Sequence, residues 1–389
     1  MSNDAPSIVL IAGEASGDLH GAHLAAEIKR RLPAARIWGV GGRKMAEAGV
    51  ELLYDSSTWS AIGIAEGIKV GPRLLRTFYE LKIRLRNDSP NVLILIDFGF
   101  FNVRLAKGLR LERTKVLYYF PPGSWRRNAS YQKLKGVADV IVTPFSWSAE
   151  VLQEQGFCAK FFGHPLLDIV RPKLTRKEFC EYLGLDSESE IVGLLPGSRV
   201  HEVKYNLPAL LGTAEKISKK FSKVQFVIPL AQSVNPEEIN KKLSRYKGTK
   251  LFVATDITYE TLAYSRAAAI VSGTATIEAA ILGCPMVIIY KGSKFLALEY
   301  KMRRKAIKFI GMPNIILDRL ACPELIQEEA SPERISELMA KLISQTPERE
   351  KMKADLAEVK ALLGSPGAVE KTADLVIDLL SNKEHERIR

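Results

Sequence analysis

Two short stretches in the second half of the chain carry residue types that suit a nucleotide. Gly197, Ser198 and Arg199 follow a predicted strand and precede an amphipathic, helix-length stretch. Backbone N–H groups at a helix start, with a guanidinium beside them, form a site for a diphosphate. The same residues can instead form a helix cap with an arginine on the surface. The spacing therefore predicts either a diphosphate site or a cap.

The second stretch, SGTATIE, follows another predicted strand with small and hydroxyl residues. Glu278 lies about one turn into the next helix, where a carboxylate can accept both hydroxyls of a ribose. The alternative is a capping box, in which Thr274 or Ala275 caps the helix and Glu278 satisfies backbone N–H groups. The residues expected to face phosphate are Ser272, Gly273, Thr274 and Thr276.

The first half of the chain offers carboxylates instead. Glu14 and Asp18 lie in and just after the glycine-bearing loop that follows the first predicted strand. Glu14 would repel a pyrophosphate, so this loop is expected to offer hydrogen-bond acceptors to a hydroxyl-rich group such as a sugar. Asp97 ends the apolar run VLILID, with Asn102 five residues further on. A carboxylate there is placed to take a proton from an acceptor hydroxyl, or else to cap a loop.

These positions depend on parallel sheets, because ligands of open α/β sheets bind at the carboxyl ends of the strands. Short β-branched runs alternate with helical stretches, which predicts two doubly wound, Rossmann-like sheets with a site in the cleft between them. The predicted strands are 8–13, 36–42, 92–97, 115–120, 139–144 and 160–165, then 190–198, 224–230, 250–256, 267–273 and 285–292.

A polar connector near residue 170 separates the two series of strands. We expect residues 1–172 to form an acceptor-side domain and 173–359 to form a nucleotide-sugar-binding domain. Residues 360–389 are expected to form a C-terminal helix that packs back on the first domain. At 389 residues the chain is long enough for two such cores.

The net charge of +12 is concentrated in three segments, 69–86, 103–135 and 291–308, which hold 6, 9 and 7 Lys/Arg against one acid each. Large apolar residues interleave with this charge, which is typical either of solvated helix faces or of a surface for an anionic membrane. No nucleic-acid-binding motif accompanies it. The four scattered cysteines predict reduced thiols, and the sequence shows neither a signal-peptide pattern nor an apolar run long enough to span a membrane.

Seven motifs, in order along nearly the whole chain, resemble those of the lipid-A-disaccharide synthase family. They are AGEASGD, GVGGRKMAEAG, IDFGFFN, FGHPLLD, LPGSRVHEV, SGTATIEAAILGCPMVIIY and MPNIIL. The resemblance implies an inverting glycosyltransferase of the GT-B-like class. It would transfer diacylglucosamine from its UDP carrier to 2,3-diacylglucosamine 1-phosphate, yielding the disaccharide 1-phosphate and UDP without a metal or other cofactor.

The resemblance also implies roles for single residues. Asp97 would be the general base and Arg199 a contact to the UDP diphosphate. Further substrate-binding residues would be Ser16, Asn102, His164, Glu202 and Asn314, although His164 could instead only hold a loop. The protein would lie peripherally on the anionic cytoplasmic face of the inner membrane, with no nucleic-acid partner, and could be a homodimer.

Three departures from the family pattern lie in the acceptor half. Gly99 and Phe100 stand in IDFGFFN where the family usually has proline and a second aspartate. FPPGSWRR keeps only Trp125 of two usual tryptophans, and Ser146 replaces a glutamate. These departures leave open a different lipid or glycan acceptor, a UDP-sugar 2-epimerase, or a UDP-sugar-binding protein without catalysis.

Overall fold

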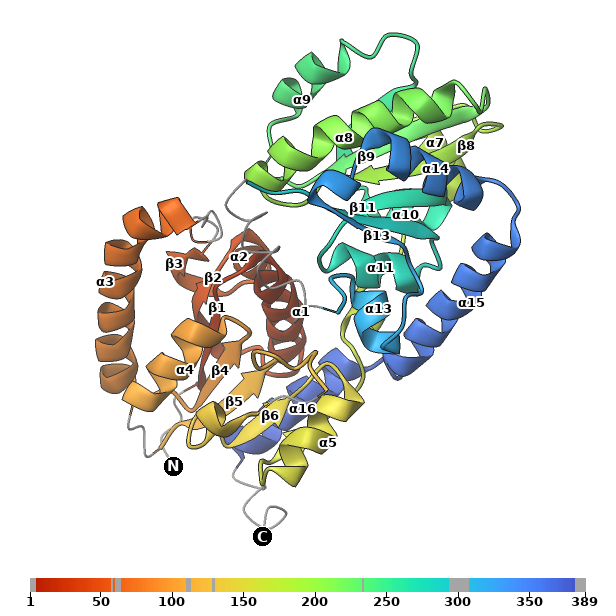
Figure 1. Ribbon diagram of the computed structural model, residues 1–389. Helices are drawn as coiled ribbons and strands as arrows, with labels where there is room; N and C mark the ends of the chain where they lie inside the picture. Colours follow the sequence, from red (N-terminus) through yellow and green to blue (C-terminus); the bar gives the residue numbers. More distant parts are fainter. Residues whose placement is uncertain are drawn as a thin grey trace. The chain divides into compact units, whose positions relative to one another are not determined.

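The computed structural model describes residues 5–56, 59, 64–109, 113–127, 130–232, 234–293 and 308–381, with the backbone alone for 64–73. It divides the chain into two compact units (Figure 1). Unit 1 comprises Met1–Asp168 with Leu363–Arg389, and unit 2 comprises Ile169–Leu362. Both divisions fall a few residues from the domain limits that the sequence predicts.

Unit 1 is built on a seven-stranded, all-parallel sheet in the order β3-β2-β1-β4-β5-β6-β7. The chain builds one side of the sheet from β1 and then the other from β4, so the strand order reverses between these two neighbours. Ala12 pairs with Ile96 at their carboxyl ends. The strands are β1 (Ser7–Ala12), β2 (Arg36–Gly41), β3 (Glu51–Asp55), β4 (Val92–Ile96), β5 (Lys115–Tyr119), β6 (Val140–Val142) and β7 (Ala159–Lys160).

Helices cover both faces of this sheet because its strands are apolar on both sides. Helices α1 and α16 cover one face, and α3 and α4 cover the other (Figure 1). The C-terminal α16 also contacts α1, where Arg31 pairs with Asp374. The helices are α1 (Ala15–Arg31), α2 (Arg43–Glu47), α3 (Ile64–Asp88), α4 (Gly99–Gly108), α5 (Ser146–Glu154), α6 (Leu166–Ile169) and α16 (Ala368–Leu380), with a 3₁₀ turn at Gln132–Leu134.

Unit 2 repeats the plan with a six-stranded parallel sheet in the order β10-β9-β8-β11-β12-β13. Here the strand order reverses between β8 and β11. The strands are β8 (Glu190–Leu195), β9 (Val224–Leu230), β10 (Leu251–Thr255), β11 (Ser265–Val271), β12 (Met286–Tyr290) and β13 (Glu324–Ile326). The helices are α7 (Arg176–Leu183), α8 (Val200–Ser218), α9 (Pro236–Leu243), α10 (Thr258–Tyr264), α11 (Ala275–Ile281), α13 (Met312–Leu317), α14 (Pro332–Ile343) and α15 (Pro347–Leu362), with a 3₁₀ turn at Gln327–Glu329.

The predicted class of two doubly wound α/β sheets is confirmed, and three details differ. The short strands β3 and β13 were not predicted. The predicted strand 160–165 is wrong, since pairing ends at Lys160. Gly163 has a φ of +105°, outside the range of a strand, and the His164 N–H donates to the carbonyl of Leu363. A neighbouring loop therefore takes the hydrogen bond that a sheet partner would have taken.

Candidate active site

Asp97 lies at the point of unit 1 where the strand order reverses. Asp97 directly follows β4, and Glu14 comes two residues after the end of β1. Because β1 and β4 pair in parallel, both carboxylates lie at the carboxyl-terminal edge of the sheet. Asp97 and Phe98 each have a φ of +45°, which is uncommon for residues with a side chain. The chain turns here from the strand into α4 and leaves Asp97 partly buried.

The surroundings of Asp97 favour its neutral form. Burial, followed by the nearby charge of Glu14, raises the pKa of Asp97 from 3.8 to about 6. The Phe98 N–H hydrogen bond opposes this shift without cancelling it. A carboxylate whose pKa lies near neutrality can take a proton in one step of a reaction and release it afterwards. This is the electrostatic setting expected for a general base.

An aromatic cluster lies beside Asp97. Phe98 stacks with Trp59 and with Phe101, at 5.9 and 5.2 Å between ring centroids, and Phe78 meets Phe101 edge to face. A Cβ on Gly13 would lie 2.3 Å from the Phe98 ring, so only glycine lets the first loop pack there. Aromatic rings thus fill one side of the Asp97 turn, and the run FGFFN was the sequence signal for them.

Asn102 is fully buried behind the turn. Its Nδ2 donates to the carbonyls of Asp97, Ile96 and Ile11 at 2.9, 3.2 and 3.4 Å. The side chain therefore joins the ends of β4 and β1. A contact between Asn102 and substrate stays a prediction, while the structure gives it a role in holding the strand ends together.

Of the predicted residues in and just after the loop that follows β1, one has a structural role and two are partly exposed. Asp18 is buried, and its carboxylate accepts the N–H groups of Gly42, Lys44 and Met45 at 2.7 to 3.1 Å. It therefore stabilises the start of α2. Glu14 and Ser16 lie at the start of α1 and are partly exposed. Contacts from these three residues to a sugar stay predictions.

His164 lies in a buried aromatic group formed with His20, Phe120 and Phe145. Its Nδ1 accepts the N–H of Leu166 at 3.2 Å, which leaves the proton of the neutral ring on Nε2. Burial lowers the pKa of His164 to about 3, so the ring is neutral near pH 7. These contacts support a role in holding its loop, and contact with substrate stays a prediction.

The Gly197–Arg199 loop of unit 2 wraps around a carboxylate of its own chain. Glu202, which is buried, accepts the N–H groups of Ser198 and Arg199 at 2.9 and 3.2 Å, and its second oxygen lies 3.3 Å from the Arg199 guanidinium. Gly197 has a φ of +106°, and a Cβ there would lie 2.6 Å from that carboxylate. The predicted cap is therefore present. The loop also has the donors that bind an anion, with Glu202 in the anion's place.

The SGTATIE stretch follows β11, next to the strand that precedes this loop. The Thr274 side chain makes no capping hydrogen bond to α11, so it does not form its half of the proposed capping box. Glu278 is buried and accepts the Tyr259 hydroxyl at 3.4 Å. Tyr259, on α10, was missed by sequence reasoning because nothing in the chain near it signals a site.

Two of the hydroxyls expected to face phosphate are used within unit 2. Ser272 donates to the Ile310 carbonyl at 2.6 Å, and Thr276 donates to the Gly273 carbonyl at 2.7 Å. Gly273 is exposed, and Thr274 is partly exposed at the same turn. Contacts of these four residues with phosphate stay predictions.

Asn314 serves as a scaffold residue in α13. It is fully buried, donates to the Cys322 carbonyl and the Glu324 carboxylate, and accepts the N–H groups of Ala321 and Cys322, all at 2.7 to 2.8 Å. Four hydrogen bonds satisfy an asparagine side chain. A contact between Asn314 and substrate stays a prediction. Such a contact would require the side chain to give up at least one of these hydrogen bonds.

Two of the departures from the family pattern pack against each other. A Cβ on Gly99 lies 2.5 Å from the ring carbons of Pro122, so a larger residue at position 99 does not fit against FPPGSWRR. Phe100 is 72% exposed, with the Arg104 guanidinium 3.9 Å from its ring centroid. Trp125 is also exposed and lies under Arg126. The altered loops therefore present aromatic rings covered by arginines.

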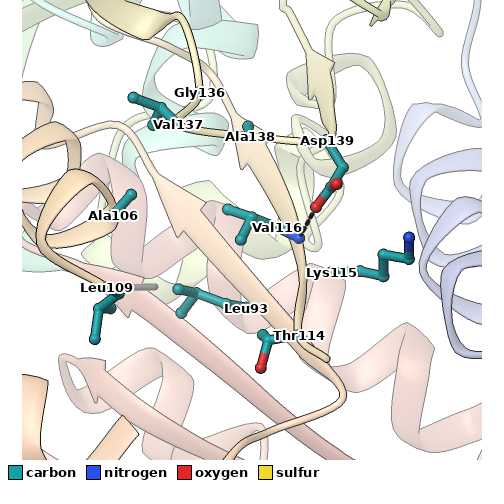
Figure 2. Close-up of a pocket in the computed structure, with 10 residues that line it drawn as sticks. All are labelled: Leu93, Ala106, Leu109, Thr114, Lys115, Val116, Gly136, Val137, Ala138 and Asp139. Carbon is teal, nitrogen blue, oxygen red and sulfur yellow. Dashed lines mark hydrogen bonds between the residues drawn. The ribbon is translucent and has the colours of Figure 1, made fainter. Parts of the chain in front are cut away.

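A separate cavity of about 260 Å³ lies at the other end of the same sheet (Figure 2). Leu93 and Lys115, from the amino ends of β4 and β5, line it, and the Val116 N–H donates to Asp139 at its edge. Asp97 lies at the carboxyl end of β4, so this cavity is not part of the candidate site.

Comparisons with known proteins agree with the predicted resemblance. The family model for lipid-A-disaccharide synthetase matches residues 8–375. A relative in Geobacter sulfurreducens, a lipid-A-disaccharide synthase, is 37% identical over 384 residues, covering 98% of this chain and 99% of its own.

Solved structures show the same fold at low identity. The S. aureus MnaA–UDP complex matches with a TM-score of 0.63 at 11% identity, over 97% of each chain. The calicheamicin glycosyltransferase CalG4 matches with a TM-score of 0.59 at 13% identity, over 97% of this chain and 99% of its own. The full-length sequence matches show that the chain belongs to the lipid-A-disaccharide synthase family, the glycosyltransferases of lipid A biosynthesis.

Proposed function

We propose that this chain condenses UDP-2,3-diacylglucosamine with 2,3-diacylglucosamine 1-phosphate, giving the disaccharide 1-phosphate and UDP. The observation that carries the proposal beyond family membership is the Asp97 turn. A partly buried carboxylate lies near Glu14 where the strand order reverses, and its pKa is raised to about 6. That combination suits removal of a proton from a sugar hydroxyl.

The proposed reaction is a single displacement. Asp97 accepts the proton of the acceptor hydroxyl, and the oxygen forms a bond to the anomeric carbon of the donor. The bond from that carbon to the UDP oxygen breaks with inversion, and UDP leaves with the electron pair. The Arg199 guanidinium and the N–H groups of its loop stabilise the charge on the diphosphate.

Donor binding follows from the anion-binding loop. We propose that the diphosphate replaces the Glu202 carboxylate as acceptor of the Ser198 and Arg199 N–H groups. Glu278 accepts the ribose hydroxyls, and the Tyr259 hydroxyl orients its carboxylate. Sequence and local geometry support these assignments.

A surface for the membrane lies on α3. Leu75, Tyr79 and Ile83 recur every four residues and are 57, 56 and 59% exposed, so they form an apolar stripe on one side of the helix. Arg76 and Arg84 lie on the same helix with exposed guanidinium groups. None of the helices in the described ranges is long and apolar enough to cross a bilayer.

We propose that this stripe binds peripherally to the anionic cytoplasmic face of the inner membrane. Most of the third basic segment, residues 294–307, lies outside the described residues. Vesicle co-sedimentation with and without about 30% anionic lipid tests the stripe. Combined serine substitutions at Leu75, Tyr79 and Ile83 should weaken binding, whereas Leu320→Ser, which alters an exposed leucine of unit 2, should not. Equal binding by both variants would contradict the proposal.

A product assay tests the reaction itself. The purified protein is incubated with both acylated substrates in detergent with EDTA, and products are identified by mass spectrometry. A disaccharide 1-phosphate from the parent protein, absent with Asp97→Asn, supports the proposal, and its formation in EDTA supports the expectation that no metal is needed. UDP binding without disaccharide would favour a different acceptor or a binding protein without catalysis. Isomerised UDP-sugar would favour an epimerase.

A further inference from the structure

The carbonyl of Asp97 accepts two hydrogen bonds from side chains. The Tyr118 hydroxyl and the Asn102 Nδ2 each lie 2.9 Å from this oxygen. Both hydrogen bonds go to the main-chain oxygen of Asp97, so they fix the peptide plane that follows this residue. That plane sets the backbone angle from which the Asp97 side chain projects.

The sheet determines where the Tyr118 hydroxyl lies. Tyr118 belongs to β5 and pairs with Leu95 of β4, so its ring runs beside the last residues of β4. The ring is fully buried in the same core cluster as Leu95 and Phe101. Burial, and then the charge of Asp97, raise the pKa of Tyr118, so the hydroxyl keeps its proton and remains a donor near pH 7.

The turn that these donors hold is a strained one. Asp97 and Phe98 both lie in the left-handed region, where a Cβ crowds the backbone, and neither is glycine. Such a conformation persists only when surrounding contacts determine it. The two hydrogen bonds to the Asp97 carbonyl are contacts of that kind.

We propose that Tyr118 is a positioning residue for the transfer reaction, holding Asp97 in the left-handed turn that keeps its carboxylate partly buried and near Glu14. The inference deepens the proposed function, since it rests on Asp97 as the general base. Nothing in the motifs that identify the family singles out Tyr118, whose importance follows from its reach across the sheet.

The test is Tyr118→Phe, which removes the hydroxyl and keeps the ring. We expect kcat to fall about tenfold, with the KM of the donor and the affinity for UDP unchanged. The acid limb of the pH–kcat profile should move to lower pH, because a relaxed turn exposes the carboxylate to water. Tyr119→Phe, the next residue of β5, is the matched control, since its ring packs in the cluster on the other face.

A double-variant comparison separates positioning from general damage. If Tyr118 acts through Asp97, adding Tyr118→Phe to Asp97→Asn should change the residual activity less than twofold. An equal tenfold loss in both backgrounds, or an unchanged kcat in the single variant, would overturn the proposal. Near-UV circular dichroism and UDP titration establish that each variant is folded.

The pKa of Asp97 gives a readout that does not depend on the acceptor. It can be followed by the ¹³C carboxyl resonance that disappears in Asp97→Asn. In Tyr118→Phe this pKa should fall toward the ordinary value, and an unchanged pKa would contradict the positioning role. Absence of disaccharide from the parent protein would contradict the proposed function alone, and the titration would still decide the role of Tyr118.

Discussion

The Asp97 turn of unit 1 and the Gly197–Arg199 loop of unit 2 both lie where the strand order of their parallel sheet reverses. The Asp97 turn follows β4, the later of the two strands at the reversal, the Gly197 loop follows β8, the earlier of its two, and each holds a carboxylate. In unit 2 the Glu202 carboxylate accepts two backbone N–H groups and lies against a guanidinium. In unit 1 the Asp97 carboxylate lies near a second carboxylate, and the next residue, Phe98, stacks with Phe101.

This difference shows that the fold fixes the place of a site and the local donors fix its chemistry. A loop rich in N–H donors and one guanidinium stabilises an anion. A partly buried turn with a like charge nearby does the opposite and makes its carboxylate more basic. Two similar sheets can therefore supply a leaving-group site and a base.

Removal of the base should have the largest effect. Asp97→Asn should lower kcat by about 10²-fold or more while UDP still binds, because the amide cannot accept the proton. Initial rates of disaccharide formation and calorimetric titration with UDP measure the two quantities. Full activity in this variant would remove Asp97 from the mechanism.

The pH profile should show the raised pKa of Asp97. Because the reactive form is the carboxylate, kcat/KM should fall about tenfold per pH unit below pH 6. A profile that stays flat down to pH 4.5 would contradict the assignment.

The contribution of Asp97 to folding stability should change with pH in the opposite direction to kcat/KM. The folded-state pKa is raised, so the contribution of Asp97 to stability is fully present below pH 3.8 and is lost as pH rises through about 6. At pH 8, Asp97→Asn should therefore raise the free energy of unfolding by up to about 3 kcal/mol. The gain should vanish near pH 4, and urea titrations at both pH values measure it.

On the donor side, Glu278→Gln should raise the donor KM about tenfold with a smaller change in kcat, since a ribose contact acts equally in the ground and transition states. Tyr259→Phe, which removes only the partner hydroxyl, should have a weaker effect of the same sign. An unchanged donor KM in Glu278→Gln would show that Glu278 serves only the local structure of α11.

The smallest effect should come from Glu202→Gln. Loss of the charge that competes with the diphosphate should tighten UDP binding by about threefold to tenfold. The weaker cap should lower the free energy of unfolding by about 1 kcal/mol. Weaker UDP binding would show instead that Glu202 mainly orients Arg199. The Asp97 and Glu202 sites would then share only their location at a reversal of the strand order.

The pattern of the chain was enough to predict both sheets, the strand-end positions of Asp97 and Arg199, and the family. Apolar β-branched runs followed by glycine and polar residues carry that information locally. The same pattern could not show that Asp18, Asn102 and Asn314 make buried hydrogen bonds to residues of other elements. An asparagine or aspartate after a strand looks alike whether it faces a ligand or a backbone.

The sequence by itself determined the fold class, the order of the elements and the chemistry available at each strand end, because these depend on neighbours along the chain. Only the tertiary structure decided how that chemistry is tuned. It brings Glu14 to Asp97, places the Tyr118 hydroxyl on the Asp97 carbonyl, and closes the Gly197 loop on Glu202. Burial, charge interactions and hydrogen bonds across strands arise only when distant segments pack together. These three effects set the basicity of the carboxylate that we propose as the base.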